Sequence, residues 1–250
     1  MTVLHLADGT EAADLAAFLS RLLHYDRAAA VRLQAAGTAL AVFGRPASFE
    51  VLAVRAVRLA KPYENGLDVT LDVTVSAGEL LESVDETAAT AAVPAAVTGP
   101  PWAGVLPPRG GWRPEPGLPP VEALRTLVSA AVAEFRSRTG ELPPERRTRG
   151  ELDRIGHEIW SRTVGRTRLP VRAVHAAQSL GFLRAAAASA SASASASSAS
   201  ASSASASSAS AGEGGLALFA SGAWLRLRTP YGSIAVRQAA GLGTLGISVR

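Results

Sequence analysis

The sequence contains no cysteine in its 250 residues, so disulfide bonds and thiolate metal sites are excluded. It also has no apolar stretch close to the roughly 20 residues that a membrane-spanning helix needs. Asp8, Glu11 and Asp14 stand near the N-terminus, where a secretory signal peptide would carry basic residues. We therefore expect a cytoplasmic protein with no membrane partner.

Lysine is almost absent, since Lys61 is the only one and arginine supplies the other 24 of the 25 basic residues. Because this bias is typical of a GC-rich genome, the number of arginines is weak evidence for phosphate binding. Their distribution is more informative: the net charge is −5 over residues 1–108, +6 over residues 109–184 and +3 over residues 185–250. An acidic segment is thus followed by a basic one that is suited to a polyanion.

Aromatic residues make up only 5% of the chain, so leucine, valine and alanine must supply most of the core. Over residues 1–90 the spacing of apolar residues predicts a helix around Leu15–Leu23, with Asp8 or Thr10 as its cap. It then predicts strands at 30–34, 38–43, 49–59 and 67–75, the last alternating strictly between apolar and polar residues. We therefore expect an α+β domain with an antiparallel sheet and helices on one of its faces.

Two stretches have compositions that do not build a core. Residues 91–120 are rich in Pro, Gly and Ala, which is typical of an extended linker. Residues 185–211 consist of alanine and serine, which predicts a disordered insert. These stretches divide the chain into predicted segments at 1–90, 121–184 and 212–250.

The segments on either side of the insert suggest a family. Residues 121–138 have a helical pattern, and residues 148–184 contain two short helical patterns that flank an arginine-bearing turn. Residues 216–220, 224–228 and 233–237 then predict a small antiparallel ribbon. This order of elements resembles a winged-helix domain, a variant of the helix-turn-helix fold. The resemblance implies a C-terminal helical domain with a small β-ribbon, which makes the whole chain α+β.

The resemblance also implies a DNA interface and its residues. The helix at 170–180 would enter the major groove and present one polar face to the bases, formed by Arg172, His175, Gln178 and Ser179. Arg166 and Arg168 in the preceding turn would bind phosphates, and Arg226 and Arg228 on the ribbon would add backbone contacts. The expected function is non-catalytic binding of duplex DNA. The alternative is a protein-interaction or scaffold protein in which the same fold docks a protein partner.

Enzyme motifs have weak support in the sequence. Gly241–Gly246 matches the G-x-G-x-x-G pattern of dinucleotide sites, but only four residues follow it, too few for the required helix. His157-Glu158 lacks the second histidine of a zinc-protease helix, and the four histidines have no ligand spacing. Asp68 and Asp72 are expected on the solvated face of a strand. We therefore expect no catalytic activity, no metal and no cofactor.

Overall fold

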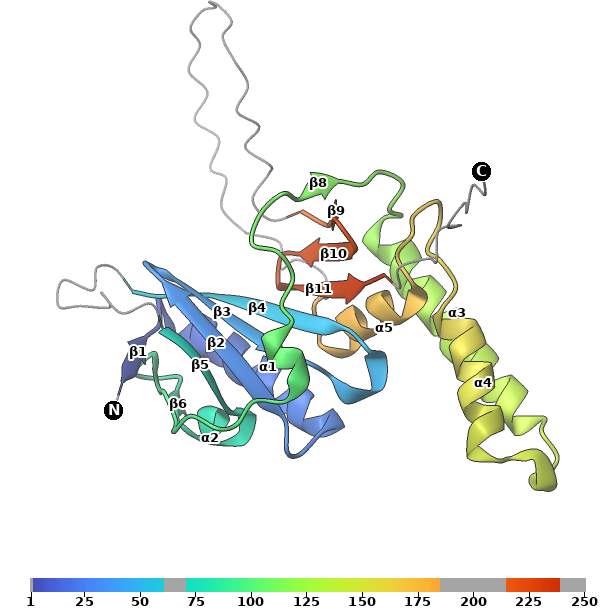
Figure 1. Ribbon diagram of the computed structural model, residues 1–250, viewed down its shortest axis with the longest axis horizontal. Helices are drawn as coiled ribbons and strands as arrows, with labels where there is room; N and C mark the ends of the chain where they lie inside the picture. Colours follow the sequence, from blue (N-terminus) through green and yellow to red (C-terminus); the bar gives the residue numbers. More distant parts are fainter. Residues whose placement is uncertain (1, 61–70, 185–214, 239–250) are drawn as a thin grey trace, which may run out of the picture.

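A computed structural model describes residues 2–60, 71–184 and 215–238 (Figure 1). The predicted N-terminal helix is confirmed as α1 (Gly9–Tyr25), which follows the short strand β1 (Val3–His5). Asp8 is its cap, because the Asp8 carboxylate accepts a hydrogen bond from the Glu11 amide at 2.9 Å. The apolar stripe of α1, including Leu15, Phe18 and Leu22, is buried.

Eight strands form one antiparallel sheet within the described residues, in the order β5-β2-β3-β4-β11-β10-β9-β8. A separate three-stranded sheet has the order β1-β7-β6. The predicted Asn65-Gly66 turn and the first part of the predicted strand at 67–75 lie outside the described residues. The strands, other than β1, are β2 (Ala30–Ala36), β3 (Ala39–Gly44), β4 (Leu52–Arg58), β5 (Leu71–Ser76), β6 (Val84–Asp85), β7 (Thr90–Ala92), β8 (Arg113–Pro114), β9 (Ala217–Ser221), β10 (Trp224–Thr229) and β11 (Gly232–Arg237).

The N-terminal and C-terminal parts of the chain share the large sheet through strands β4 and β11. Ser233 pairs with Val54, Ile234 with Ala53 and Ala235 with Leu52. Residues 233–236 of β11 are all buried, so this strand has no solvated face. A strand that is buried on both faces belongs in the interior of a sheet, and β11 accordingly lies between β4 and β10.

The remaining helices are α2 (Ala77–Glu82), α3 (Val121–Gly140), α4 (Arg149–Trp160) and α5 (Val171–Ser179), with short 3-10 turns at η1 (Ala47–Phe49), η2 (Pro101–Gly104) and η3 (Pro144–Arg146). Helix α2 packs against β5 and α5 against β11, while α3 and α4 contact α5. Helices α3 and α4 form a hairpin that projects from the body of the molecule (Figure 1). No helix among the described residues is both long and apolar enough to cross a membrane.

The prediction of a C-terminal winged-helix-like helical domain is wrong. The C-terminal part of the chain is mainly sheet, formed by β9–β11, and the helices lie in the middle of the sequence. The three ribbon strands were expected to form a separate wing beside α5. Strand β11 does pack against α5, but it also pairs with β4 and so belongs to the large sheet. Helix α5 buries Ala173 and Ala176 as well as Val171, Val174 and Ala177, so most of its circumference is packed. It is a core helix against β11, and not a helix that protrudes from the surface.

The outer face of the sheet is covered by residues 93–114, which we call the strap and which cross in front of the sheet in Figure 1. This segment belongs to the predicted linker at 91–120. Trp102 packs against a cluster that includes Phe43 and Val54. Arg32 donates a hydrogen bond to the Ala103 carbonyl, and β8 at the end of the strap pairs with β9. The strap therefore runs along both halves of the sheet. The predicted segment boundaries remain predictions, and the insert at 185–211 lies outside the described residues.

Candidate functional site

The predicted DNA-contacting residues fall into three separate groups. One group lies on the outward side of α5, one in the turn before α5, and one on β10. The α5 group consists of Arg172, His175, Gln178 and Ser179. The turn contains Arg166 and Arg168, and β10 contains Arg226 and Arg228.

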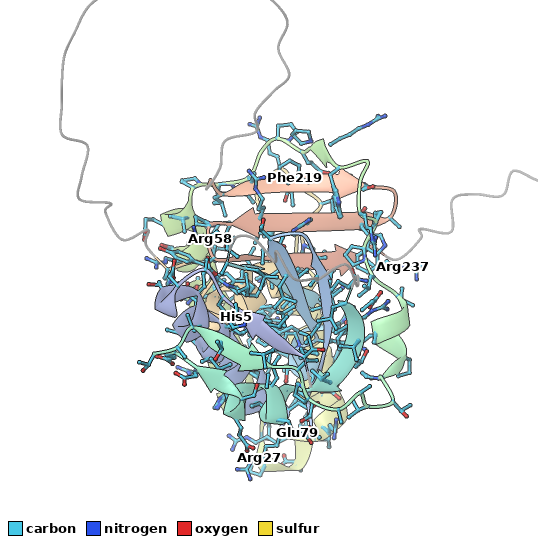
Figure 2. The ribbon with its side chains drawn as sticks, turned by 90° about the vertical axis from the view of Figure 1, so that its left-hand side faces the viewer. His5, Arg27, Arg58, Glu79, Phe219 and Arg237 are labelled. Atoms are coloured by element: carbon cyan, nitrogen blue, oxygen red, sulfur yellow. The ribbon has the colours of Figure 1, made fainter. Side chains whose placement is uncertain are left out.

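The two arginines of β10 lie on the opposite face of the sheet from α5. Leu225 and Leu227 point into the core that α5 completes, so the alternating Arg226 and Arg228 point outward. Arg226 donates from Nε to Ser233 Oγ at 3.0 Å, and burial lowers the pKa of its guanidinium, with Arg228 contributing. The Arg228 guanidinium lies 5.2 Å from the ring centroid of Phe219, which Figure 2 labels on β9. Neither side chain shares a surface with α5.

The arginines of the turn also lie away from the α5 face. Arg168 is bound to Glu115 at 2.8 Å and donates to Gln238 Oε1 at 2.9 Å, which ties the turn to the segment after the strap and to the end of β11. The Arg168 hydrogen bonds hold the pKa of Glu115 below its ordinary value. Arg166 is exposed beside Gly117.

The outward side of α5 lines two adjoining hollows. The larger, which we call the aromatic cleft, has a volume of about 750 Å³ and lies between α4, α5, η1 and the end of α1. The smaller, which we call the α3–α5 hollow, has a volume of about 450 Å³. Arg172 lines the first, Gln178 and Ser179 line the second, and His175 borders both. The structure thus brings these four predicted residues together, but in a concave surface.

Aromatic rings form the walls of the cleft as a chain of contacts. The ring centroids of Tyr25 and Phe49 are 5.2 Å apart, and those of Phe49 and His175 are 5.0 Å apart, both edge-on. His175 stacks on Trp160 at 4.6 Å and 27°, and Trp160 lies 6.1 Å from Phe135. Such distances are those at which ring pairs attract one another.

Local sequence places these rings. Pro46 precedes η1, which turns Phe49 into the core, while Glu50 adopts a left-handed conformation with φ of 52° and is exposed. In α4, Gly156 stands one turn before Trp160, and a Cβ at this position would be in ordinary contact, at 3.5–3.6 Å, with the rings of Trp160 and Phe135. Gly156 therefore lines the cleft beside these rings without a side chain of its own.

The polar groups of the cleft are unevenly distributed. Arg149 and Asp153 pair at 3.7 Å, and their side chains are 95% and 72% exposed, so they belong to the rim. Deeper in the cleft, burial lowers the pKa of His175 below its ordinary 6.5, so the imidazole is neutral at pH 7. Among the described residues, none accepts a hydrogen bond from Arg172, and its Nε is buried without a partner.

The same cleft contains a serine and a histidine in contact. Ser161 Oγ and His157 Nε2 are 3.5 Å apart, at the limit of a hydrogen bond. Asp153, one turn earlier on α4, pairs with Arg149, and within the described ranges no group orients the His157 ring. A nucleophile activated by a base needs that orientation. The described residues also contain no cluster of His, Cys, Asp or Glu that could hold a metal ion.

Sequence reasoning missed the cleft. No sequence pattern predicted a function for Trp160, Tyr25, Phe49 or Phe135. These residues are far apart in the chain and belong to four different elements, so no local spacing relates them. The G-x-G-x-x-G match at Gly241–Gly246 and Asp68 lie outside the described residues, whereas Asp72 is bound to Arg32 at 2.7 Å.

Comparison with known proteins gave two family matches. A family model described as Domain of unknown function (DUF8010) matches residues 1–104, and one described as Domain of unknown function (DUF8185) matches residues 107–241. No curated protein and no solved structure matches the chain.

Proposed function

We propose that this chain, which belongs to the family described as Domain of unknown function (DUF8185), is a non-catalytic binding protein that holds a small ligand in its aromatic cleft. We also place it in the cytoplasm. One observation carries the proposal: four of the chain's 13 Phe, Trp and Tyr residues converge with His175 on a single cleft. Buried rings elsewhere, such as the stacked pair Phe18 and Phe182, lie within the packed core, whereas a purely structural role would not require these rings to meet around an open space.

The dimensions and chemistry of the cleft suit a ligand. Its volume of about 750 Å³ is within the range of roughly 300–1,000 Å³ that small-molecule sites have. Such sites combine apolar walls with a few polar groups that fix the orientation of the ligand. Arg172 is a polar group of this kind. The long contact between Ser161 and His157 favours binding over catalysis.

Contact with duplex DNA remains a prediction, and the geometry supports it less well. That function needs Arg172, Arg166 and Arg226 on one surface, whereas they belong to a cleft, a turn and the opposite face of the sheet. A recognition helix must also protrude, whereas α5 is flanked by α3 and η1. The docking of a protein partner remains the alternative, with the cleft accepting one of the partner's side chains.

Trp160 provides a direct test, because it is the only one of the chain's four tryptophans that lines the cleft. In the triple variant Trp102→Phe, Trp112→Phe and Trp224→Phe, all tryptophan emission comes from Trp160. We expect saturable quenching when the full-length variant is titrated with the neutral aromatic probe N-phenyl-1-naphthylamine.

The matched control is Trp160→Phe, which keeps the other three tryptophans and should give no saturable response. The proposal would be abandoned if the Trp160-only variant were not quenched, or if both variants were quenched alike. Displacement of the probe by a protein but by no small aromatic compound would favour the docking alternative.

A further inference from the structure

We infer that the ligand of the aromatic cleft is a small planar aromatic compound with an anionic group, which binds to Arg172 while its ring packs against the wall that Phe49, His175 and Trp160 form together. This inference rests on the proposed function and assigns its ligand class. The anionic group is a carboxylate, sulfonate or phosphate, all of which a guanidinium binds in the same way.

The first step concerns the missing counter-ion of Arg172. Half-buried arginines elsewhere have an acceptor for the guanidinium: Arg138 binds Glu158 at 2.8 Å, Arg184 binds Asp14 at 2.6 Å, and Arg226 donates to Ser233 Oγ at 3.0 Å. The guanidinium of Arg172 has no such partner among the described residues. A partly buried cation without a partner is destabilising. An anion that enters the cleft can therefore form an ion pair with Arg172 that no side chain of the described residues provides.

Arg55 provides a useful contrast. Its Nε is also buried without a partner, but its terminal nitrogens donate to Tyr231 O, Glu11 and Asp14 at 2.7, 3.2 and 3.1 Å. Its charge is therefore compensated within the fold. A single unpartnered Nε does not indicate a ligand, whereas an entire guanidinium without an acceptor beside an open cavity does.

The second step concerns the sign of the ligand's charge. Aromatic cages often bind cations, but Arg172 would repel a cation from this one. The carboxylates of the cleft, Asp153 and Glu50, lie at the exposed rim, where water and salt screen them. The deeper part contains Arg172 and the neutral imidazole of His175, so its net charge is positive.

The third step concerns the shape of the ligand. His175 and Trp160 already stack at 27°, and Phe49 meets His175 edge-on, so the walls present both ring faces and ring edges. A planar ring forms favourable contacts with both. Gly156 lines the cleft beside Trp160 without adding a side chain.

A matched pair of probes tests the inference. The fluorescent probe 1-anilinonaphthalene-8-sulfonate is N-phenyl-1-naphthylamine with an added sulfonate. We expect the full-length protein to bind the sulfonate probe roughly tenfold to a hundredfold more tightly than the neutral probe, as a hydrogen bond to a charged group implies. Arg172→Met, which keeps the aliphatic stem, should remove this difference and leave the affinity for the neutral probe unchanged.

The control variant is Arg166→Met, since Arg166 is an exposed arginine in the preceding turn and does not line the cleft. It should bind both probes as the wild-type protein does. Thermal unfolding of each variant verifies the fold, because a partly unfolded protein also binds the sulfonate probe.

Three results would overturn the inference: sulfonate binding that is unchanged in Arg172→Met, an equal loss of affinity for both probes in that variant, or equal affinity of the wild-type protein for the two probes. These results differ from failure of the proposed function, in which neither probe quenches Trp160 at all. If both probes bind the wild-type cleft with equal affinity, the protein binds a ligand but not an anion.

Discussion

Replacement of Arg55 by Met should destabilise the protein strongly, because Arg55 joins three parts of the fold from a buried position. Its side chain is 8% exposed and contacts Glu11 and Asp14 on α1, as well as the Tyr231 carbonyl in the turn between β10 and β11. Removing one partner of a buried ion pair costs about 3–5 kcal/mol, since the other charge is left without compensation.

The surrounding contacts place the expected cost at the lower end of this range. Glu11 keeps its contact with Arg58 at 2.8 Å, and Asp14 keeps Arg184 at 2.6 Å. We therefore expect a loss of about 3 kcal/mol in the free energy of unfolding. For a chain of this size, about 3 kcal/mol corresponds to a fall in Tm of roughly 6–12 °C.

Thermal and urea unfolding, followed by circular dichroism, measure this loss. The matched control is Arg58→Met, because Arg58 (labelled in Figure 2) contacts the same Glu11 but its side chain is 72% exposed. We expect the control to lose much less stability than Arg55→Met, because solvent screens an exposed ion pair. Equal losses for the two variants, or a loss below about 1 kcal/mol for Arg55→Met, would refute the argument that burial determines the value of this contact.

Three further predictions concern pH and DNA. Two hydrogen bonds from Arg138 lower the pKa of Glu158 to about 2 from 4.5, so their contribution to stability is present above pH 4.5 and is lost as the pH falls towards 2. Glu158→Gln should flatten the acid limb of the Tm profile, and an unchanged limb would contradict this. Burial lowers the pKa of His175 below 6.5, so its contribution is complete above pH 6.5 and is lost as the pH falls through the folded-state value. His175→Phe should remove that dependence, as Tm measured on either side of pH 6.5 will reveal. Anisotropy titrations with labelled duplex DNA should detect only weak, sequence-independent binding, with a Kd of about 10⁻⁴–10⁻⁶ M at physiological salt. Tighter, sequence-selective binding that Arg172→Ala weakens would instead support the DNA interface.

Elements with a strong local period could be predicted from the sequence. Helix α1 has its apolar residues on one stripe behind an aspartate cap, and β10 alternates between buried and partly exposed residues from Trp224 to Thr229. In both cases the pattern depends only on neighbours within a few residues. Such patterns identify an element and its buried face.

The position of β11 could not be predicted in this way. Its residues Ser233–Val236 are consistent with any strand that is covered on both faces, and the partner, β4, is about 180 residues earlier in the chain. Alanine adds a second ambiguity, because Ala173 and Ala176 fit either a solvated or a buried helix face. These two uncertainties together made a core helix and an interior strand resemble a recognition helix and a wing.

The candidate site depends on tertiary structure even more strongly. Helical spacing predicts Arg172 and His175 on one side of α5, and both residues line the cleft. It could not indicate that η1 and α4 enclose this side. Phe49 and Trp160 become walls of the same cleft only when the chain folds. No local sequence pattern therefore indicates that the surface of α5 lines a cleft and does not protrude.

The most direct measurement of the central claim is a crystal structure of the full-length protein soaked with a bromonaphthoate, a planar aromatic carboxylate whose bromine gives an anomalous signal. Our account predicts the bromine signal in the aromatic cleft, with the ring against the wall that Phe49, His175 and Trp160 form. It predicts the carboxylate about 2.7–2.9 Å from the guanidinium nitrogens of Arg172, the distance of a charge-assisted hydrogen bond. A bromine signal outside the cleft, or a ring in the cleft with its carboxylate directed away from Arg172, would contradict it.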